Sequence, residues 1–302
     1  MSRAVHFSEF GPASVLHLAE VDVPDPAPGK IRVSMRAAGI NPFDVKYRSG
    51  AMVGSMTTNF PAPLGREVAG VVDAIGEGVT TLAVGDEVFG TVAGVGLAEL
   101  VLTNPKNMAR RPAALPWEVA GAISVAGQSA WDEIESQGIR DADTVFVSAA
   151  AGGVGAIAAQ LCVLRGATVV GSASEANHEA LREIGVIPVT YGPDLAERVR
   201  AAAPSPVTVV LDHHGAESIE AALELGVPVE KINTTSGLSE QYGVQGVARG
   251  PVNPPTLEAL ADLVVTGKLH IWVEAIYPLS KIVDAYERLE QGHLRGKIVI
   301  VP

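Results

Sequence analysis

The sequence predicts an α/β protein of two domains, in which a strand-rich first part precedes a doubly wound parallel sheet. Before residue 117, short stretches that alternate apolar and polar residues are separated by Gly and Pro. From residue 144 onward, wholly apolar stretches alternate with stretches of helical periodicity. The length of 302 residues agrees with this division, because single domains usually run to about 100–200 residues.

The first part is expected to be a barrel-like all-β unit. Residues 31–37 alternate apolar and polar side chains, as a half-buried strand does. Residues 68–75 form a more continuous apolar run, and residues 84–90 read as a turn followed by a short strand. Residues 117–135 are rich in Ala and Glu and predict a helix that links the two parts.

The middle of the chain predicts a parallel sheet that is covered on both faces, because its strands are apolar throughout. The expected strands are residues 144–148, 168–172, 187–190, 207–212 and 229–234. The expected helices between and after them are residues 154–165, 177–184, 195–203 and 218–224. Beyond an irregular segment at 235–255, the chain predicts a helix at 256–266, a strand at 269–273, a helix at 280–290 and a strand at 297–301.

Composition excludes several classes of function. Hydrophobic residues make up 47% and charged residues 19% of the chain, which predicts a folded protein with a large core. The net charge of -12 argues against a nucleic-acid partner, because an acidic surface repels phosphates. No long apolar window predicts a membrane-spanning helix, and the first residues lack the apolar core of a signal peptide. A cytoplasmic location, with no membrane partner, is therefore expected.

The strongest local signal is a glycine-rich turn between an expected strand and an expected helix. It runs from Ala149 through Gly152, Gly153 and Val154 to Gly155. Gly152 allows close approach of a pyrophosphate, Gly155 allows the helix to pack on the strand, and the helix N-terminus offers free N–H groups to phosphate. Ala149 replaces the usual first glycine. The alternative is a plain strand–helix turn, but the β/α units that follow favour a dinucleotide site.

The residues after the second strand of the sheet favour NADPH over NADH. An NAD site usually has an acidic residue there that binds the ribose 2′-hydroxyl. This chain has Ser172 and Ser174 instead, and His178 and Tyr191 follow closely enough in sequence to contact a 2′-phosphate. Glu175 is a contrary sign, and the two serines also fit an ordinary polar loop.

Several motifs in one order resemble a known family. The turn at 149–155 is joined by residues 37–50 (AAGINPFDVKYRSG), 63–72 (PLGREVAGVV), 85–90 (GDEVFG) and 292–299 (GHLRGKIV). Together they span nearly the whole chain. The chain resembles the zinc-free quinone oxidoreductases, the zeta-crystallin-like branch of the medium-chain dehydrogenase/reductase superfamily.

The resemblance implies a GroES-like β-barrel domain and a Rossmann domain, with the cofactor in the cleft between them. The expected boundaries are 1–118, completed by 278–302, for the first domain and 119–277 for the second. Relatives form dimers by joining their Rossmann sheets edge to edge. The apolar stretch 269–277 is the expected edge strand for such a homodimer.

The resemblance also bears on metals. Zinc-dependent members of the superfamily have a Cys where this chain has Asn41 and a His where it has Arg66. Cys162 is the one cysteine of the chain, so neither usual zinc site can form, and no metal site is expected. Cys162 itself is interpreted as a small buried hydrophobe. His213 and His214 are neighbours on a strand end and point to opposite faces, so we expect them to line the cleft rather than chelate a metal.

The implied activity is hydride transfer from NADPH to a small quinone, enone or related carbonyl acceptor. By resemblance, Asn41 lies near the nicotinamide ribose, and Lys46 and Tyr47 are candidates to hydrogen-bond a developing oxyanion or enolate. The alternative for Lys46 and Tyr47 is a solvated helix face. In relatives, the residues at Gln128, and at Ser236 and Gly237 after the fifth strand, face the cofactor.

Two other functional classes remain open from the sequence. One is a nucleotide-binding redox sensor or crystallin-like protein without significant turnover. The other is a zinc alcohol dehydrogenase, which the shortage of metal ligands disfavours. The sequence does not name the acceptor, because residues 91–99 and the stretch after residue 235 are short compared with relatives and border the substrate cleft there.

Overall fold

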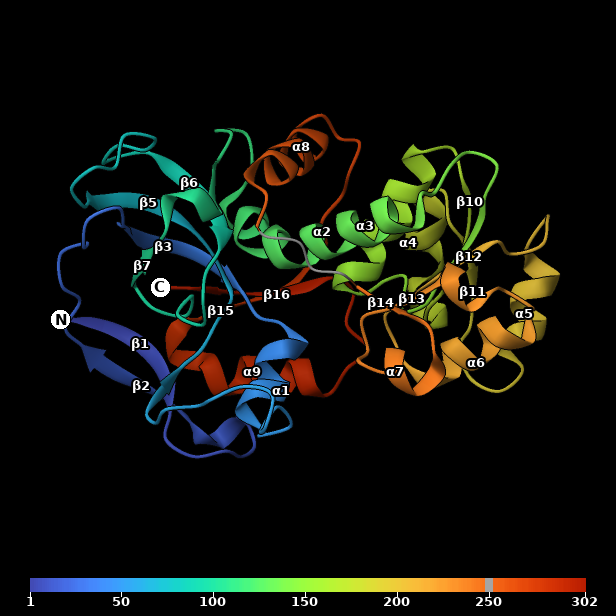
Figure 1. Ribbon diagram of the computed structural model, residues 1–302, viewed down its shortest axis with the longest axis horizontal. Coiled ribbons are helices and arrows are strands. Elements are labelled where there is room, and N and C mark those ends of the chain that lie inside the picture. The colour runs from blue at the N-terminus through green and yellow to red at the C-terminus, as the bar shows by residue number, and fades with distance from the viewer. Residues whose placement is uncertain (248–251) are drawn as a thin grey trace. The chain divides into compact units, whose positions relative to one another are not determined.

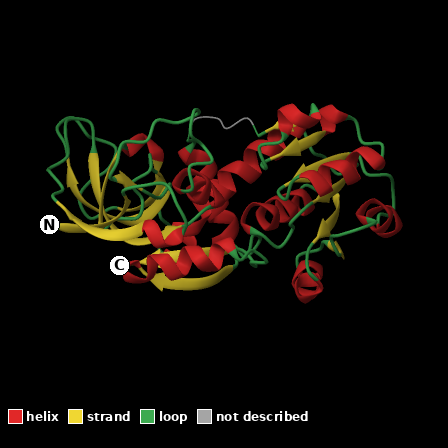
Figure 2. Cartoon of the chain, turned by 90° about the horizontal axis from the view of Figure 1, so that it is seen from below, coloured by secondary structure: helices red, strands yellow, loops and turns green. Residues whose placement is uncertain are grey.

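The computed structural model describes residues 1–247 and 252–302 and divides the chain into two compact units (Figure 1). The first unit contains Met1–Val125, Val252–Gly267 and Ile271–Pro302, and the second contains Ala126–Pro251 and Lys268–His270. Both chain termini belong to the first unit and lie among its strands (Figure 2).

The first unit is the strand-rich one. Its strands are β1 (Ser2–Phe7), β2 (Leu16–Val21), β3 (Ile31–Gly39), β4 (Ala62–Pro63), β5 (Glu67–Ile75), β6 (Glu87–Thr91), β7 (Leu100–Thr103), β8 (Met108–Arg110), β15 (Val273–Pro278) and β16 (Lys297–Val301). Its helices are α1 (Pro42–Arg48), α8 (Pro254–Val265), α9 (Ile282–Glu290) and the beginning of α2 (Trp117–Gln137), which continues into the second unit.

These strands form two sheets around one core. A three-stranded sheet has the order β2-β1-β4, and a seven-stranded sheet has the order β15-β16-β3-β5-β6-β8, with β7 paired to β3. The core between them contains fully buried Val5, Phe7, Val33, Val68 and Ile300. The C-terminal strand β16 belongs to the seven-stranded sheet, because it pairs with β3 in the register Val299↔Gly39. The GroES-like barrel expected from the sequence is present.

The second unit is a parallel sheet with helices between its strands. Its strands are β9 (Thr144–Val147), β10 (Thr168–Ser172), β11 (Ile187–Val189), β12 (Val209–Asp212), β13 (Ile232–Thr234) and β14 (Gln245–Gly246), in the order β11-β10-β9-β12-β13-β14. Its helices are the rest of α2 and α3 (Gly153–Leu164), α4 (His178–Glu183), α5 (Leu195–Ala202), α6 (Ala216–Glu224) and α7 (Ser239–Tyr242). The pairs that join these strands are parallel, and the order reverses between β9 and β12, as in a Rossmann domain.

Helices cover both faces of this sheet. On β10, Val170 belongs to the core that α5 and α6 complete with Leu195 and Ile219. The next residue, Gly171, faces the other way, and an added Cβ there would meet Val186 at 2.7 Å and Leu181 of α4 at 3.8 Å. Because successive residues of a strand point to opposite faces, α4 covers the face opposite to α5 and α6.

The structure corrects the expected edge strand at residues 269–277. Residues 269–272 are not a strand, and β15 (Val273–Pro278) pairs with β16 in the seven-stranded sheet of the first unit. The apolar alternation indicates a strand, but its partner is set by long-range pairing that the local pattern does not contain. A dimer through this strand as a Rossmann edge is therefore not supported.

The unit boundaries also differ from those expected. Residues 252–267 and 271–277 lie in the first unit, because α8 packs on β8 and β15 pairs with β16. The segment 235–255, expected to be irregular, contains α7 and the short β14, and its residues 248–251 lie outside the described part. Among the described residues, no helix is both long and apolar enough to cross a membrane.

Candidate cofactor and acceptor sites

The C-terminal edge of the parallel sheet brings most of the expected cofactor residues together. Ala149 follows β9, Ser172 ends β10, Tyr191 follows β11, and Ser236 follows β13. Parallel strands carry their C-terminal ends to one edge, and ligands of such sheets bind where the strand order reverses. That point lies at the C-terminal ends of the neighbouring strands β9 and β12, and the glycine-rich turn follows β9.

The turn has the backbone shape that a phosphate site requires. Ala149 has a left-handed φ of 46°, the conformation that a glycine adopts without strain. Gly152 is the N-cap of α3, and Gly153, Val154 and Gly155 form its first turn. A Cβ on Gly155 would lie 2.4 Å from the Ala149 carbonyl oxygen, so only glycine allows this approach of helix and turn. The cradle thus fits a dinucleotide pyrophosphate at the N-terminus of α3.

Asp212, which the sequence did not single out, holds the neighbouring loops in place. Its carboxylate accepts hydrogen bonds from Ser148 Oγ at 2.9 Å, Ser218 Oγ at 2.5 Å and Thr234 Oγ1 at 2.6 Å. The backbone N–H groups of residues 214 and 215 also donate to it at 2.9 Å. Burial would raise the pKa of Asp212, but these hydrogen bonds outweigh burial and lower it. An ionised Asp212 therefore ties β9, β12 and β13 together beside the turn.

The two serines expected near the ribose differ in accessibility. Ser172 is 2% exposed, whereas Ser174 is half-buried and its Oγ accepts a hydrogen bond from Asn177 Nδ2 at 3.1 Å. His178 begins α4, and its Nε2 is buried without a hydrogen-bond partner among the described residues. Tyr191 is 39% exposed and stacks on His214, with ring centroids 6.3 Å apart. The accessible groups after β10 are thus Ser174 and its neighbours rather than Ser172.

The remaining expected cofactor residues lie in the second unit. Gln128 is a half-buried residue of α2 whose Nε2 donates to Asp132 Oδ1 at 2.7 Å. The Ser236 backbone N–H donates to Thr234 Oγ1 at 3.0 Å, and Gly237 has a φ of 92° that suits glycine. These contacts fix the loop after β13 at the same sheet edge.

Beside this loop lies a buried pair of ionisable groups, of which the sequence pointed to His213 but not to Glu133. His213 Nε2 is 3.3 Å from Glu133 Oε1 on α2, and the two side chains are 5% and 0% exposed. Burial lowers the pKa of His213, but its interactions with Glu133 and the charge of Asp212 together outweigh burial and raise it. Burial also raises the pKa of Glu133. On its other side, His213 Nδ1 is 3.4 Å from Thr235 Oγ1.

In the first unit, Asn41 belongs to a buried polar network. Its Nδ2 donates to Glu67 Oε1 at 2.9 Å, and Lys297 Nζ donates to its Oδ1 at 2.5 Å. Lys297 Nζ also bonds Glu67 Oε1 and the Ile40 carbonyl oxygen, each at 3.0 Å. The Val125 backbone N–H donates to Glu67 Oε2 at 2.8 Å. With Asn41 4% exposed, both polar atoms of its amide bond to protein groups.

The other expected catalytic residues, Lys46 and Tyr47, lie on α1, which also carries the buried Asp44. Asp44 is 1% exposed, and burial raises its pKa to about 6, although the hydrogen bond from the Asn41 N–H opposes this shift. Lys46 is exposed on the other side of the helix. Tyr47 is half-buried and meets the core residue Phe7 edge-on, with ring centroids 5.5 Å apart.

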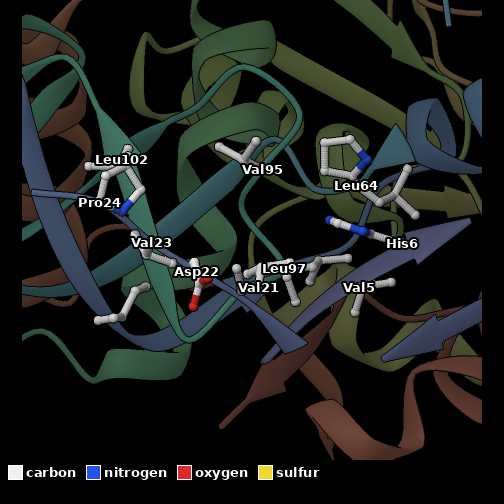
Figure 3. Close-up of a pocket in the computed structure, with 14 residues that line it drawn as sticks. Val5, His6, Val21, Asp22, Val23, Pro24, Leu64, Val95, Leu97 and Leu102 are labelled. Carbon is white, nitrogen blue, oxygen red and sulfur yellow. The ribbon is translucent and has the colours of Figure 1, made fainter. Parts of the chain in front are cut away.

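A cavity of about 240 Å³ lies elsewhere in the first unit (Figure 3). Aliphatic side chains from β1, the end of β2, β4 and residues 95–102 line it, together with His6 and Asp22. Burial and the nearby His17 lower the pKa of His6. None of the expected catalytic residues lines this cavity, so it is not the place where they would meet an acceptor.

Metal ligands are not gathered in the described part of the chain. Within residues 1–247 and 252–302, no group of three or more His, Cys, Asp or Glu side chains is placed to hold a metal ion. Cys162 is buried, and burial raises the pKa of its thiol far above the ordinary range, so it is not a thiolate ligand or nucleophile at neutral pH.

Comparison with known families matches both units. A family described as "Alcohol dehydrogenase GroES-like domain" matches residues 27–108, and one described as "Zinc-binding dehydrogenase" matches residues 169–300. The chain belongs to the medium-chain dehydrogenase/reductase superfamily.

Individual members of the superfamily resemble the chain over its whole length. The structure of the quinone oxidoreductase from Coxiella burnetii is 28% identical, with a TM-score of 0.93, and the match covers 100% of this chain and 99% of that one. The Escherichia coli quinone oxidoreductase complexed with NADPH is 25% identical, with a TM-score of 0.86 and coverage of 99% and 100%. The 2-methylene-furan-3-one reductase of Solanum lycopersicum is 29% identical over 99% of this chain and 79% of its own length.

Proposed function

We propose that this chain is an NADPH-dependent oxidoreductase that transfers hydride to a quinone, an enone or a related small carbonyl compound. The observation that supports the proposal is the turn at Ala149–Gly155, whose backbone shape and helix N-terminus at the switch point of a parallel sheet fit a phosphate group. The relatives named for quinone and enone reduction, and the relative complexed with NADPH, supply the reaction class.

The residues of the second unit fit the cofactor. The N–H groups at Gly153, Val154 and Gly155 would hold the pyrophosphate, and Ser174 with His178 would meet the 2′-phosphate. When bound, NADPH supplies the hydride. The chain's own residues bind and orient it, and the loop at Ser236–Gly237, fixed through Thr234 and Asp212, would hold the carboxamide end.

We propose that the reaction proceeds without zinc. The Asn41 amide is bonded to Glu67 and Lys297, and the Lys297 ammonium group lies within 3.0 Å of Asn41, Glu67 and the Ile40 carbonyl oxygen. A second cation at these oxygens would be repelled by the ammonium group. The acceptor must then be electrophilic without a metal, as quinones and conjugated enones are.

The decisive experiment is oxidation of NADPH at 340 nm with 9,10-phenanthrenequinone and a short enal as acceptors, with NADH as the comparison cofactor. We expect turnover with NADPH and weaker turnover with NADH, in a protein that contains no stoichiometric zinc. Tight NADPH binding without turnover on either acceptor would favour a sensor or structural protein. A requirement for bound zinc would refute the zinc-free mechanism.

A homodimer and a cytoplasmic location remain predictions. The β15 edge offers an exposed apolar side chain, Ile276, which is 52% exposed, on a strand that pairs on one side only among the described strands. Light scattering at working concentration tests the dimer, and a monomer would contradict it.

A further inference from the structure

One half-buried arginine has hydrogen-bond donors that the protein does not use. Among the described residues, the other arginines that are not exposed each donate to a carboxylate or a backbone carbonyl; these are Arg32, Arg48, Arg111, Arg165, Arg198 and Arg288. Arg66 has no such hydrogen bond in the described part of the chain, and no carboxylate lies within 4.0 Å of its guanidinium nitrogens there. A guanidinium group carries five N–H donors, so Arg66 offers them to water or to a ligand.

The side chain is nevertheless held in place. The Arg66 guanidinium carbon lies 4.3 Å from the centre of the Phe43 ring, a cation–π contact that fixes the position of the charge. Its main chain is fixed as well, because the Val92 N–H donates to the Arg66 carbonyl oxygen at 2.8 Å. The planar group therefore has a defined position and unused donors.

The Arg66 guanidinium group lies on the face of α1 that carries Lys46 and Tyr47, two of the expected catalytic residues. Phe43 precedes Lys46 by three residues and Tyr47 by four, so these side chains share one helix face. Arg66 covers Phe43 on that face. The next residue, Glu67, begins β5, and its side chain points to the opposite face, where it accepts a hydrogen bond from Asn41.

The residues first expected to bind a developing negative charge are less suited to it. The Asn41 amide bonds Glu67 and Lys297 and is 4% exposed. The Tyr47 ring packs against Phe7. Lys46 is exposed, so water screens its charge. Arg66 combines partial burial, a fixed position and donors with no protein acceptor in the described part, and it carries a permanent positive charge that the Tyr47 hydroxyl lacks.

We propose that Arg66 is a catalytic residue that binds the carbonyl oxygen of the acceptor and stabilises the negative charge that develops there. The proposal rests on the reductase function. Hydride addition to the β-carbon of an enone shifts the C=C electron pair toward the carbonyl carbon and the C=O pair onto oxygen. Arg66 donates N–H bonds to that enolate oxygen, and a proton from water then completes the α-carbon. A guanidinium group aimed at this oxygen supplies the charge stabilisation that a metal ion supplies elsewhere.

The test compares Arg66→Met, Arg66→Lys and Arg66→Ala with Arg36→Met, a matched control that removes an exposed arginine from β3 of the same unit. The measured quantities are kcat and KM for a short enal and for 9,10-phenanthrenequinone, the dissociation constant of NADPH from its fluorescence, and the thermal midpoint. Guanidinium chloride, far below unfolding concentrations, is added to Arg66→Ala to replace the missing group.

We expect Arg66→Met to lower kcat for the enal by about 100-fold, as removal of an oxyanion donor does. The dissociation constant of NADPH should not change. The loss should be smaller for the quinone, whose reduced form spreads its charge over an aromatic system. Arg66→Lys should retain more activity than Arg66→Met, Arg66→Ala should recover activity with guanidinium, and Arg36→Met should behave like the wild type.

Three results would overturn the assignment. They are unchanged enal turnover in Arg66→Met, an equal loss for both acceptors without guanidinium rescue, and a loss explained wholly by weaker NADPH binding. If Arg66→Met does not fold, Arg66→Lys gives the same comparison of acceptors with the charge retained. Absence of turnover in the wild type would instead refute the reductase function, so the two failures are distinguishable.

Discussion

Removal of the Lys297 ammonium group is the most informative perturbation of the first unit. Lys297 is 5% exposed, and its Nζ contacts Glu67 Oε1 at 3.0 Å, Asn41 Oδ1 at 2.5 Å and the Ile40 carbonyl oxygen at 3.0 Å. Glu67 is 0% exposed. Lys297→Met would keep the aliphatic stem but leave the Glu67 carboxylate buried without its counter-charge.

The magnitude follows from the cost of an uncompensated buried charge. Breaking a buried ion pair by removing one partner costs about 3–5 kcal/mol. Replacing both partners with uncharged groups is often nearly neutral. We therefore expect Lys297→Met to lower the free energy of unfolding by about 3–5 kcal/mol, and the double variant with Glu67→Gln to recover most of that loss. The side-chain amide introduced by Glu67→Gln would keep an oxygen for the Val125 N–H.

Urea unfolding followed by tryptophan fluorescence measures these differences, since the chain has three tryptophans. Lys30→Met is the control, because Lys30 is an exposed lysine of the same unit. If Lys297→Met cost no more than Lys30→Met, or if the double variant were no more stable than Lys297→Met alone, the buried pair would not be the reason for the effect.

Three further predictions concern pH and backbone strain. The pKa of Asp44 is raised by burial from 3.8 to about 6, so the folded state holds this proton more tightly and loses stability as pH rises from about 4 to 6. Asp44→Asn should remove this pH dependence, which amounts to about 3 kcal/mol of the free energy of unfolding. If urea unfolding gave the same free energy across this pH range in the wild type, the shift would be refuted. The pKa of His213 is raised because its interactions with Glu133 and the charge of Asp212 together outweigh burial. The stability that His213 contributes is therefore complete below about pH 6.5 and lost as pH rises through the higher folded value. Glu133→Gln should flatten this part of the unfolding profile, and a persistent slope would assign it to other groups. Finally, Ala149→Gly should raise the free energy of unfolding by roughly 1 kcal/mol with NADPH affinity retained, because Ala149 has a left-handed φ of 46°; a loss of stability would show that the turn is not strained there.

The sequence predicted most elements of the parallel-sheet unit and the last strand of the first unit. The strands 168–172 and 297–301 coincide with β10 and β16, and the helix expected at 154–165 is α3, displaced by one residue. These segments are short and apolar, or begin at a glycine turn, so their local pattern is enough to define them. The sequence also predicted the position of the glycine-rich turn, because glycine is needed where the helix backbone approaches the turn closely, as at Gly155.

The pairing of distant strands was not visible in the same way. The alternation in residues 273–278 indicates a strand but not its neighbour, and the structure pairs it with β16 rather than with the parallel sheet. The apolar residues of the stretch 269–272 predict a strand, and tertiary packing places it in no sheet. Hydrogen bonding between segments far apart in sequence decides such cases, and local propensity does not.

For the candidate site, too, the sequence determined some features and only the tertiary structure decided the others. By itself, the sequence determined the superfamily, the dinucleotide turn and the shortage of metal ligands, because these depend on residue types at fixed spacings. Only the tertiary structure decided that Asn41 is bonded to Glu67 and Lys297, which are 26 and 256 residues away along the chain, and that Arg66 lies over Phe43 with its donors unused by the described residues. Burial and hydrogen-bond partners are properties of the folded chain, so the roles of polar side chains are settled only when distant segments meet.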